Sequence, residues 1–171
     1  MKVSSSFHFC HAMQRSDWKT MKVLLAIDGS SYSAAAAQLV ATRPWPPNTT
    51  VRVLMAVESI MQPPDMWSGM VGVETLELAR KELMRQATQV VNGVAETLRA
   101  TGLEVETAVR EGDPRSVIMD QAQEWSADLI VVGSHGYTGL KRLLLGSVAQ
   151  SVVSHAPCSV EVVRKKQTAS V

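Results

Sequence analysis

Short runs that predict strands alternate regularly with stretches of helical periodicity, and this alternation constrains the fold more than any other feature of the sequence. The predicted strands are residues 22–27, 50–57, 103–109, 129–132 and 159–163. The predicted helices are residues 33–41, 73–99 and 114–125, and a fourth that begins at residue 147. Such alternation builds a mainly parallel sheet, because right-handed crossovers bring each strand back in the same direction and place helices on both faces.

We therefore expect an α/β fold, a doubly wound, open, Rossmann-like five-stranded parallel sheet with strand order 3-2-1-4-5. The third strand alternates apolar residues with Glu104 and Glu106, which favours an edge position. In this order the carboxyl ends of the first and fourth strands lie side by side. Open parallel sheets bind ligands at such a switch in strand order, so the functional site is expected there.

Length and composition favour one domain with short additions at both ends. The chain has 171 residues, enough for a single α/β domain with a substantial core. We assign residues 21–166 to this domain and residues 167–171 to a tail. Residues 1–20 form an N-terminal extension, which is either disordered or an over-long start with Met13 or Met21 as the initiator.

Charge and cysteine content argue against several partners and locations. The net charge is +1, which does not favour a nucleic acid or an acidic membrane surface as a partner. No apolar run approaches the roughly 18 residues of a membrane span. Two cysteines, Cys10 and Cys158, do not form a disulfide framework, so a reducing, cytoplasmic location is expected.

A glycine-rich loop follows the fourth predicted strand and leads into the last helix. Its spacing is Gly133-x2-Gly136-x9-Gly146-Ser147, which is neither a Walker A loop nor the dinucleotide fingerprint. Glycine permits positive φ and close approach of the backbone to a ligand, and a helix start presents free N–H groups to an anion. The loop is therefore either a phosphate site or a glycine-rich connection without a ligand.

Several polar residues are expected near this loop, each with more than one possible role. Asp28 ends the first strand, where it can hold Mg²⁺, accept a hydrogen bond from a base or ribose, or cap the first helix. Ser147 can cap the last helix, bind a phosphate, or do both. Lys141 and Arg142 can neutralise phosphate charge or remain solvated, and His135 can contact a phosphate.

The sequence does not indicate a catalytic set. Neither a Ser-His-Asp nor a Cys-His arrangement has a supporting motif, so any nucleotide hydrolysis is expected to be slow. Residues 58–72 combine prolines and methionines with Trp67. This segment can cover a ligand, form a subunit contact or fold over the edge of the core.

These motifs resemble those of the universal stress protein family over about residues 22–164. The intact glycine spacing is that of the family's nucleotide-binding members. Further matches are D-G-S at 28–30, E-G-D-P at 111–114, V-G-S-H-G at 132–136, L-L-L-G-S-V at 143–148 and A-P-C-S-V at 156–160. Residues 1–20 and 58–72 lie outside this shared set, which leaves open what covers the adenine and which partner is met.

The resemblance implies ATP as the ligand, with Mg²⁺, and a site of defined residues. Adenine and ribose are expected near Ala26, Ile27, Asp28 and Val57. The phosphates are expected on the loop and the following helix, at Val132, Gly133, Ser134, His135, Gly136, Gly146, Ser147 and Val148. The resemblance also implies a homodimer through the last strand, Ser159–Val163, whose exposed edge invites pairing.

The function expected from this resemblance is that of an ATP-binding, homodimeric regulator of the stress response with at most slow ATP hydrolysis. Two alternatives stay open. One is an adenine-nucleotide enzyme of the same fold, similar to the α-hydrolases. The other is an interaction module that binds no nucleotide, because part of the family lacks the glycine motif.

Overall fold

The computed structural model describes residues 20–59, 73–136 and 145–165, and it confirms the five-stranded parallel sheet. The strands are β1 (Lys22–Ile27), β2 (Thr50–Val57), β3 (Glu104–Glu111), β4 (Leu129–Gly133) and β5 (Ser159–Val163). They are hydrogen-bonded in the order β3-β2-β1-β4-β5, as predicted, with β3 and β5 at the edges. Residues 1–19, 60–72 and 166–171, which include most of the predicted extension, the methionine-rich segment and the tail, lie outside the described residues.

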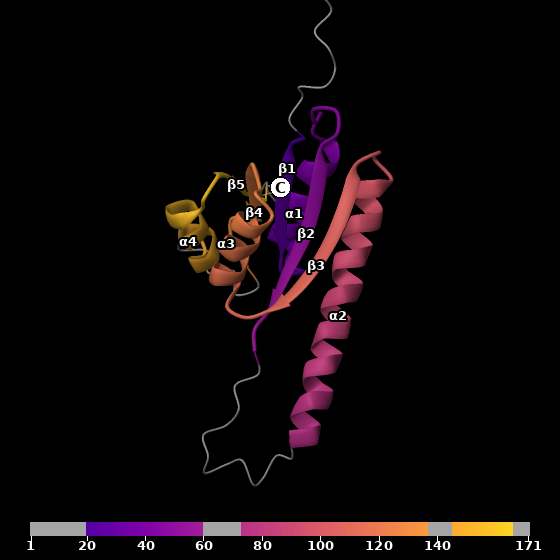
Figure 1. Ribbon diagram of the computed structural model, residues 1–171, viewed down its shortest axis with the longest axis vertical. Coiled ribbons are helices and arrows are strands. Elements are labelled where there is room, and N and C mark those ends of the chain that lie inside the picture. Colours follow the sequence, from indigo (N-terminus) through magenta and orange to yellow (C-terminus); the bar gives the residue numbers. More distant parts are fainter. Residues whose placement is uncertain (1–19, 60–72, 137–144, 166–171) are drawn as a thin grey trace, which may run out of the picture.

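In the described part of the chain, four helices cover the two faces of the sheet, as expected for a doubly wound fold. They are α1 (Ser31–Thr42), α2 (Val73–Arg99), α3 (Pro114–Glu124) and α4 (Ser147–His155). Figure 1 shows α3 and α4 together on one side of the sheet, while α1 and α2 lie against the other. No helix in the described part of the chain combines the length and apolar character that crossing a bilayer requires.

Strand β1 divides the apolar core into two layers, because successive side chains of a strand point to opposite faces. Val23, Leu25 and Ile27 pack with α1 and α2. Leu24 and Ala26 pack with α3 and α4. All five side chains are buried, so the central strand is apolar on both faces, which is the pattern of a buried parallel strand.

Polar contacts fix both ends of α1 and the start of α3. Ser30 is the N-cap of α1, and its Oγ accepts a hydrogen bond from the Ser33 N–H at 3.2 Å. Asp113 caps α3 in the same way through the Arg115 N–H. At the other end of α1, the two terminal guanidinium nitrogens of Arg43 donate to the carboxylate of Glu161 on β5, at 2.7 and 2.6 Å.

Several element boundaries differ by one or two residues from those predicted, and the differences at β3 and α1 have a clear cause. Strand β3 was expected over residues 103–109 but runs from Glu104 to Glu111, because pairing with β2 continues as far as Val57 opposite Glu111. Helix α1 begins two residues before the predicted start, because Ser30 caps it.

Candidate functional site

A cavity of about 510 Å³ opens at the carboxyl ends of β1 and β4, where the strand order reverses. Ten of the twelve predicted site residues line it, and Val57 and Ser134 do not. The lining residues predicted from the sequence are Ala26, Ile27, Asp28, Val132, Gly133, His135, Gly136, Gly146, Ser147 and Val148.

Backbone hydrogen bonds bring the two ends of the glycine loop together. The Ser134 N–H donates to the Val163 carbonyl, and the Ser134 carbonyl accepts from the Gly146 N–H, both at 2.8 Å. Ser134 is 1% exposed, so these bonds form in the interior. They place Gly136 and the start of α4 beside the same cavity, although Lys141 and Arg142 between them lie outside the described residues.

Helix α4 differs from α1 and α3 at its N-terminus, because its N-cap residue is a glycine, which has no side chain to cap the helix. Its N-cap is Gly146, and the first intrahelical bond runs from the Gln150 N–H to the Gly146 carbonyl. The N–H groups of Ser147, Val148 and Ala149 therefore have no acceptor within the helix. The predicted capping role of Ser147 is wrong, since it is the first helical residue. The positive end of the α4 dipole faces the cavity.

Asp28 lines the same cavity as the start of α4. Its Oδ1 accepts a hydrogen bond from the Ser30 N–H at 2.9 Å, which holds the turn between β1 and α1. The cap of α1 is Ser30, so the alternative in which Asp28 caps that helix is wrong. The Oδ2 of Asp28 lies only 2.9 Å from the place where a Cβ atom on Gly136 would stand.

The motif glycines are required for close packing rather than for unusual backbone angles. Positive φ occurs elsewhere among the described glycines, at Gly29, Gly102 and Gly112. A Cβ atom on Gly146 would lie 3.2 Å from the Cα atom of His135, tighter than ordinary contact. The expectation of positive φ is therefore wrong for Gly133, Gly136 and Gly146, and close approach of the backbone to a ligand stays a prediction.

His135 lies at the cavity between two neighbours that fix its ring. Its Nδ1 is 3.1 Å from the Oγ of buried Ser134. Its imidazole packs against the ring of Tyr32, with the ring centroids 5.1 Å apart and the planes tilted by 44°. Tyr32 was not identified from the sequence, because nothing local signals a contact between α1 and a loop about 100 residues later.

The sequence also missed the residues that line the other end of the cavity. These are Leu54, Met55 and Ala56 of β2, Glu58 after it, and Pro114 and Ile118 of α3. The carbonyl of Val57 accepts the Gly112 N–H on the β3 side, so Val57 turns its backbone away from the cavity. The adjacent Ala56 carbonyl points to the other side, where β1 has ended at Ile27.

Charges near the cavity mouth are paired at the start of α3. The side chain and backbone N–H of Arg115 donate to Asp113, which lowers the pKa of that carboxyl group. The same contact raises the pKa of Arg115, with a smaller contribution from the charge of Glu58. The described residues contain no group of three or more His, Cys, Asp or Glu side chains suited to a metal ion.

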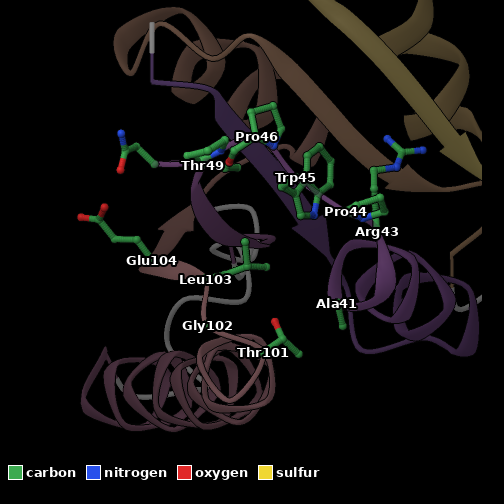
Figure 2. A pocket seen from close by; sticks show the side chains of 12 residues that line it. Ala41, Arg43, Pro44, Trp45, Pro46, Thr49, Thr101, Gly102, Leu103 and Glu104 are labelled. Carbon is green, nitrogen blue, oxygen red and sulfur yellow. The ribbon is translucent and has the colours of Figure 1, made fainter. Parts of the chain in front are cut away.

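A second hollow, of about 490 Å³, lies at the opposite end of the sheet, where β2 and β3 begin. It is bounded by the turn that leads into β2 and the turn that leads into β3, with Trp45 and Leu103 among its lining residues (Figure 2). Several polar side chains that line it have partners within the protein. The Trp45 Nε1–H donates to the Val40 carbonyl, Arg43 pairs with Glu161, and the Thr101 hydroxyl donates to the Leu98 carbonyl. The backbone N–H groups at the start of α4 lie at the first cavity, at the ends of β1 and β4.

Comparison of the sequence with known proteins identifies one family. The sequence model described as the universal stress protein family matches residues 19–164. Universal stress protein YxiE of Bacillus subtilis is 30% identical over 145 residues, which are 84% of this chain and 98% of that protein. Universal stress protein MJ0531 of Methanocaldococcus jannaschii is 32% identical over 144 residues, which are 84% of this chain and 82% of that protein.

Comparison of the structure with solved structures gives the same fold. The structure of hypothetical protein MJ0577 superposes with a TM-score of 0.74 at 25% identity, covering 86% of this chain and 97% of that one. A universal stress protein family member from Arabidopsis thaliana, solved with AMP bound, has a TM-score of 0.57 at 19% identity and covers 88% and 96%. A universal stress protein in complex with cAMP has a TM-score of 0.52 at 22% identity and covers 85% and 97%. The last two likenesses show the fold alone.

Proposed function

The chain belongs to the universal stress protein family, and on this premise we propose that it binds ATP with Mg²⁺ in the cavity at the ends of β1 and β4. The observation that carries the proposal is the N-terminus of α4, whose N-cap is a glycine and which lines the same cavity as Asp28. We propose further that nucleotide binding serves a regulatory role in the stress response, in the cytoplasm.

The phosphate end of the site is provided by the backbone. Three N–H groups at the start of α4 can donate to phosphate oxygens, and the helix dipole favours negative charge at the same place. Gly136 leaves room beside Asp28 because it carries no side chain. Backbone donors of this kind are already in position before the ligand arrives, so little ordering is needed on binding.

The base end of the site supports adenine. Leu54, Met55 and Ile118 provide an apolar lining for a flat ring. The Ala56 carbonyl offers an acceptor at the end of β1, which suits the exocyclic amine of adenine. AMP in one structural neighbour and cAMP in another are compatible with this choice.

Asp28 is the residue that we expect to hold Mg²⁺ against the phosphates. Mg²⁺ usually binds one or two carboxylates, water and phosphate oxygens, so a single aspartate suffices. Asp28→Asn should lower the affinity for ATP about tenfold in Mg²⁺ and make ATP binding insensitive to removal of Mg²⁺. The Oδ1 of the asparagine can still accept the Ser30 N–H, so the turn should persist.

Calorimetric titration with ATP, in Mg²⁺ and in EDTA, measures both effects. Glu161→Gln is the matched control, because it removes a carboxylate that does not line the cavity. Wild-type affinity and Mg²⁺ response in Asp28→Asn would rule out Asp28 as the Mg²⁺ ligand.

The proposal as a whole is tested by mass spectrometry of small molecules released when freshly purified protein is denatured. Release of an adenine nucleotide, or tight binding of added ATP, supports it. An empty cavity that also rejects added ATP would favour the interaction module. Fast ATP turnover would favour the enzyme of the same fold instead of a regulator.

We also propose that two copies pair through β5, which is an edge strand. The Val163 carbonyl points inward to Ser134, so the N–H and carbonyl of neighbouring Val162 point outward. Sedimentation velocity should give the mass of a dimer for the wild type and of a monomer for Val162→Pro, since proline removes an outward donor. A wild-type monomer at all concentrations would refute this interface.

A further inference from the structure

Tyr32 contacts the glycine loop at two places, although it belongs to α1. Its ring packs on His135 with the ring centroids 5.1 Å apart. Its backbone carbonyl carbon lies 2.8 Å from the place where a Cβ atom on Gly133 would stand, which shows how closely α1 approaches the end of β4. Direct contact therefore fixes the position of the first turn of α1 relative to the loop.

The contact with His135 is not explained by packing of the core. Tyr32 is half-buried and belongs to neither of the two apolar core layers. The other side of the contact is a residue that lines the cavity next to Gly136 and Gly146. Ser134 holds a nitrogen of the same imidazole, so Tyr32 and Ser134 together restrict the ring at one face and at Nδ1.

We propose that Tyr32 is a positioning residue of the phosphate subsite, which keeps the His135 ring beside the start of α4 and so raises the preference for ATP over AMP. This inference rests on the proposed nucleotide function. His135 lies at the glycine end of the cavity, whereas the β2 residues line the other end. Displacement of the His135 ring should therefore weaken contacts to the outer phosphates and leave contacts to the base unchanged.

The experiment compares Tyr32→Ala and Tyr32→Phe with the wild type, titrated with ATP and with AMP in Mg²⁺. An aromatic pair of this kind corresponds to a change of about three- to tenfold in affinity. Tyr32→Ala should lose that much affinity for ATP and less than about twofold for AMP. Tyr32→Phe should behave as the wild type, because it keeps the aromatic ring that packs on His135.

Trp45→Ala controls for a general loss of stability. Trp45 packs against the core at the opposite end of the sheet, where β2 and β3 begin. Its removal should therefore lower the unfolding midpoint and leave the ratio of ATP to AMP affinity unchanged. An unchanged ratio in Tyr32→Ala, or an equal loss for both nucleotides, would overturn the inference.

A second measurement needs no nucleotide. The ring protons of His135, assigned by comparison with His135→Gln, should shift in the NMR spectrum of Tyr32→Ala and stay in place in Tyr32→Phe, because the neighbouring aromatic ring shields them. Unmoved resonances in Tyr32→Ala would overturn the inference. If the wild type binds no ATP, the proposed function fails, and the ring protons still decide whether Tyr32 holds His135.

Discussion

Gly136→Val should reduce the affinity for ATP by at least about 100-fold while the domain remains folded, a loss of about 2.7 kcal/mol. A Cβ atom at this position would stand 2.9 Å from the Oδ2 of Asp28. The valine side chain would therefore push the carboxylate aside and fill the space between Asp28 and α4. Both proposed phosphate contacts, the Mg²⁺ ligand and the backbone donors, would be obstructed by one substitution.

The fold should tolerate this change because the atom it meets is the end of a side chain. A carboxylate can rotate away, whereas a backbone atom cannot, and Gly136 does not have positive φ. The destabilisation should be within about 1 kcal/mol, as for most substitutions away from the packed core. Loss of binding would then be a local effect on the site.

Titration calorimetry with Mg²⁺ and ATP, together with thermal unfolding, tests both parts of this prediction. Gly146→Val is a second arm at the start of α4, where the new Cβ atom would lie 3.2 Å from the His135 Cα. Gly93→Val is the matched control, since a Cβ atom on this helical glycine meets nothing within 4 Å. Normal ATP affinity in both loop variants would refute the assignment of this loop to the phosphates.

Most of the fold could be predicted from the sequence, because apolar runs and helix caps are local signals. The strands Lys22–Ile27 and Ser159–Val163 have the bounds expected from their residues. The end of β3 could not be placed in this way. Exposed charges near Glu111 give no apolar signal, and the strand continues only because β2 offers backbone partners as far as Val57.

The sequence marks the glycine-loop side of the cavity more clearly than the side formed by β2. The glycines and Asp28 can be recognised in the sequence itself. Which residues of β2 line the cavity depends instead on how far that strand extends beyond β1. The register pairs Ile27 with Met55, so Ala56 is the first residue past the end of β1, and this relation is absent from any local pattern. Contacts between distant elements, such as Tyr32 with His135, are equally hidden from the sequence.

Gly133 is the motif residue whose substitution should damage the fold itself. A Cβ atom there would lie 2.8 Å from the carbonyl carbon of Tyr32 and 2.9 Å from the backbone nitrogen of Ser33. Both are backbone atoms in the first turn of α1, so relief requires α1 to move away from the end of β4. The first glycine of the motif therefore serves close packing between a helix and a strand, apart from any contact with a phosphate.

We expect Gly133→Ala to lower the free energy of unfolding by about 3 kcal/mol, the upper part of the usual range for overpacking a well-packed interior. For a domain of this size the unfolding midpoint should fall by roughly 6–12 °C. Urea unfolding followed by circular dichroism, without nucleotide, measures the loss. Gly93→Ala should instead be stabilising by up to about 1 kcal/mol, because the site is open and helical. If Gly133→Ala were as stable as the wild type, α1 would not be pressed against β4, and the register that brings Asp28, Tyr32 and the loop together would need another cause.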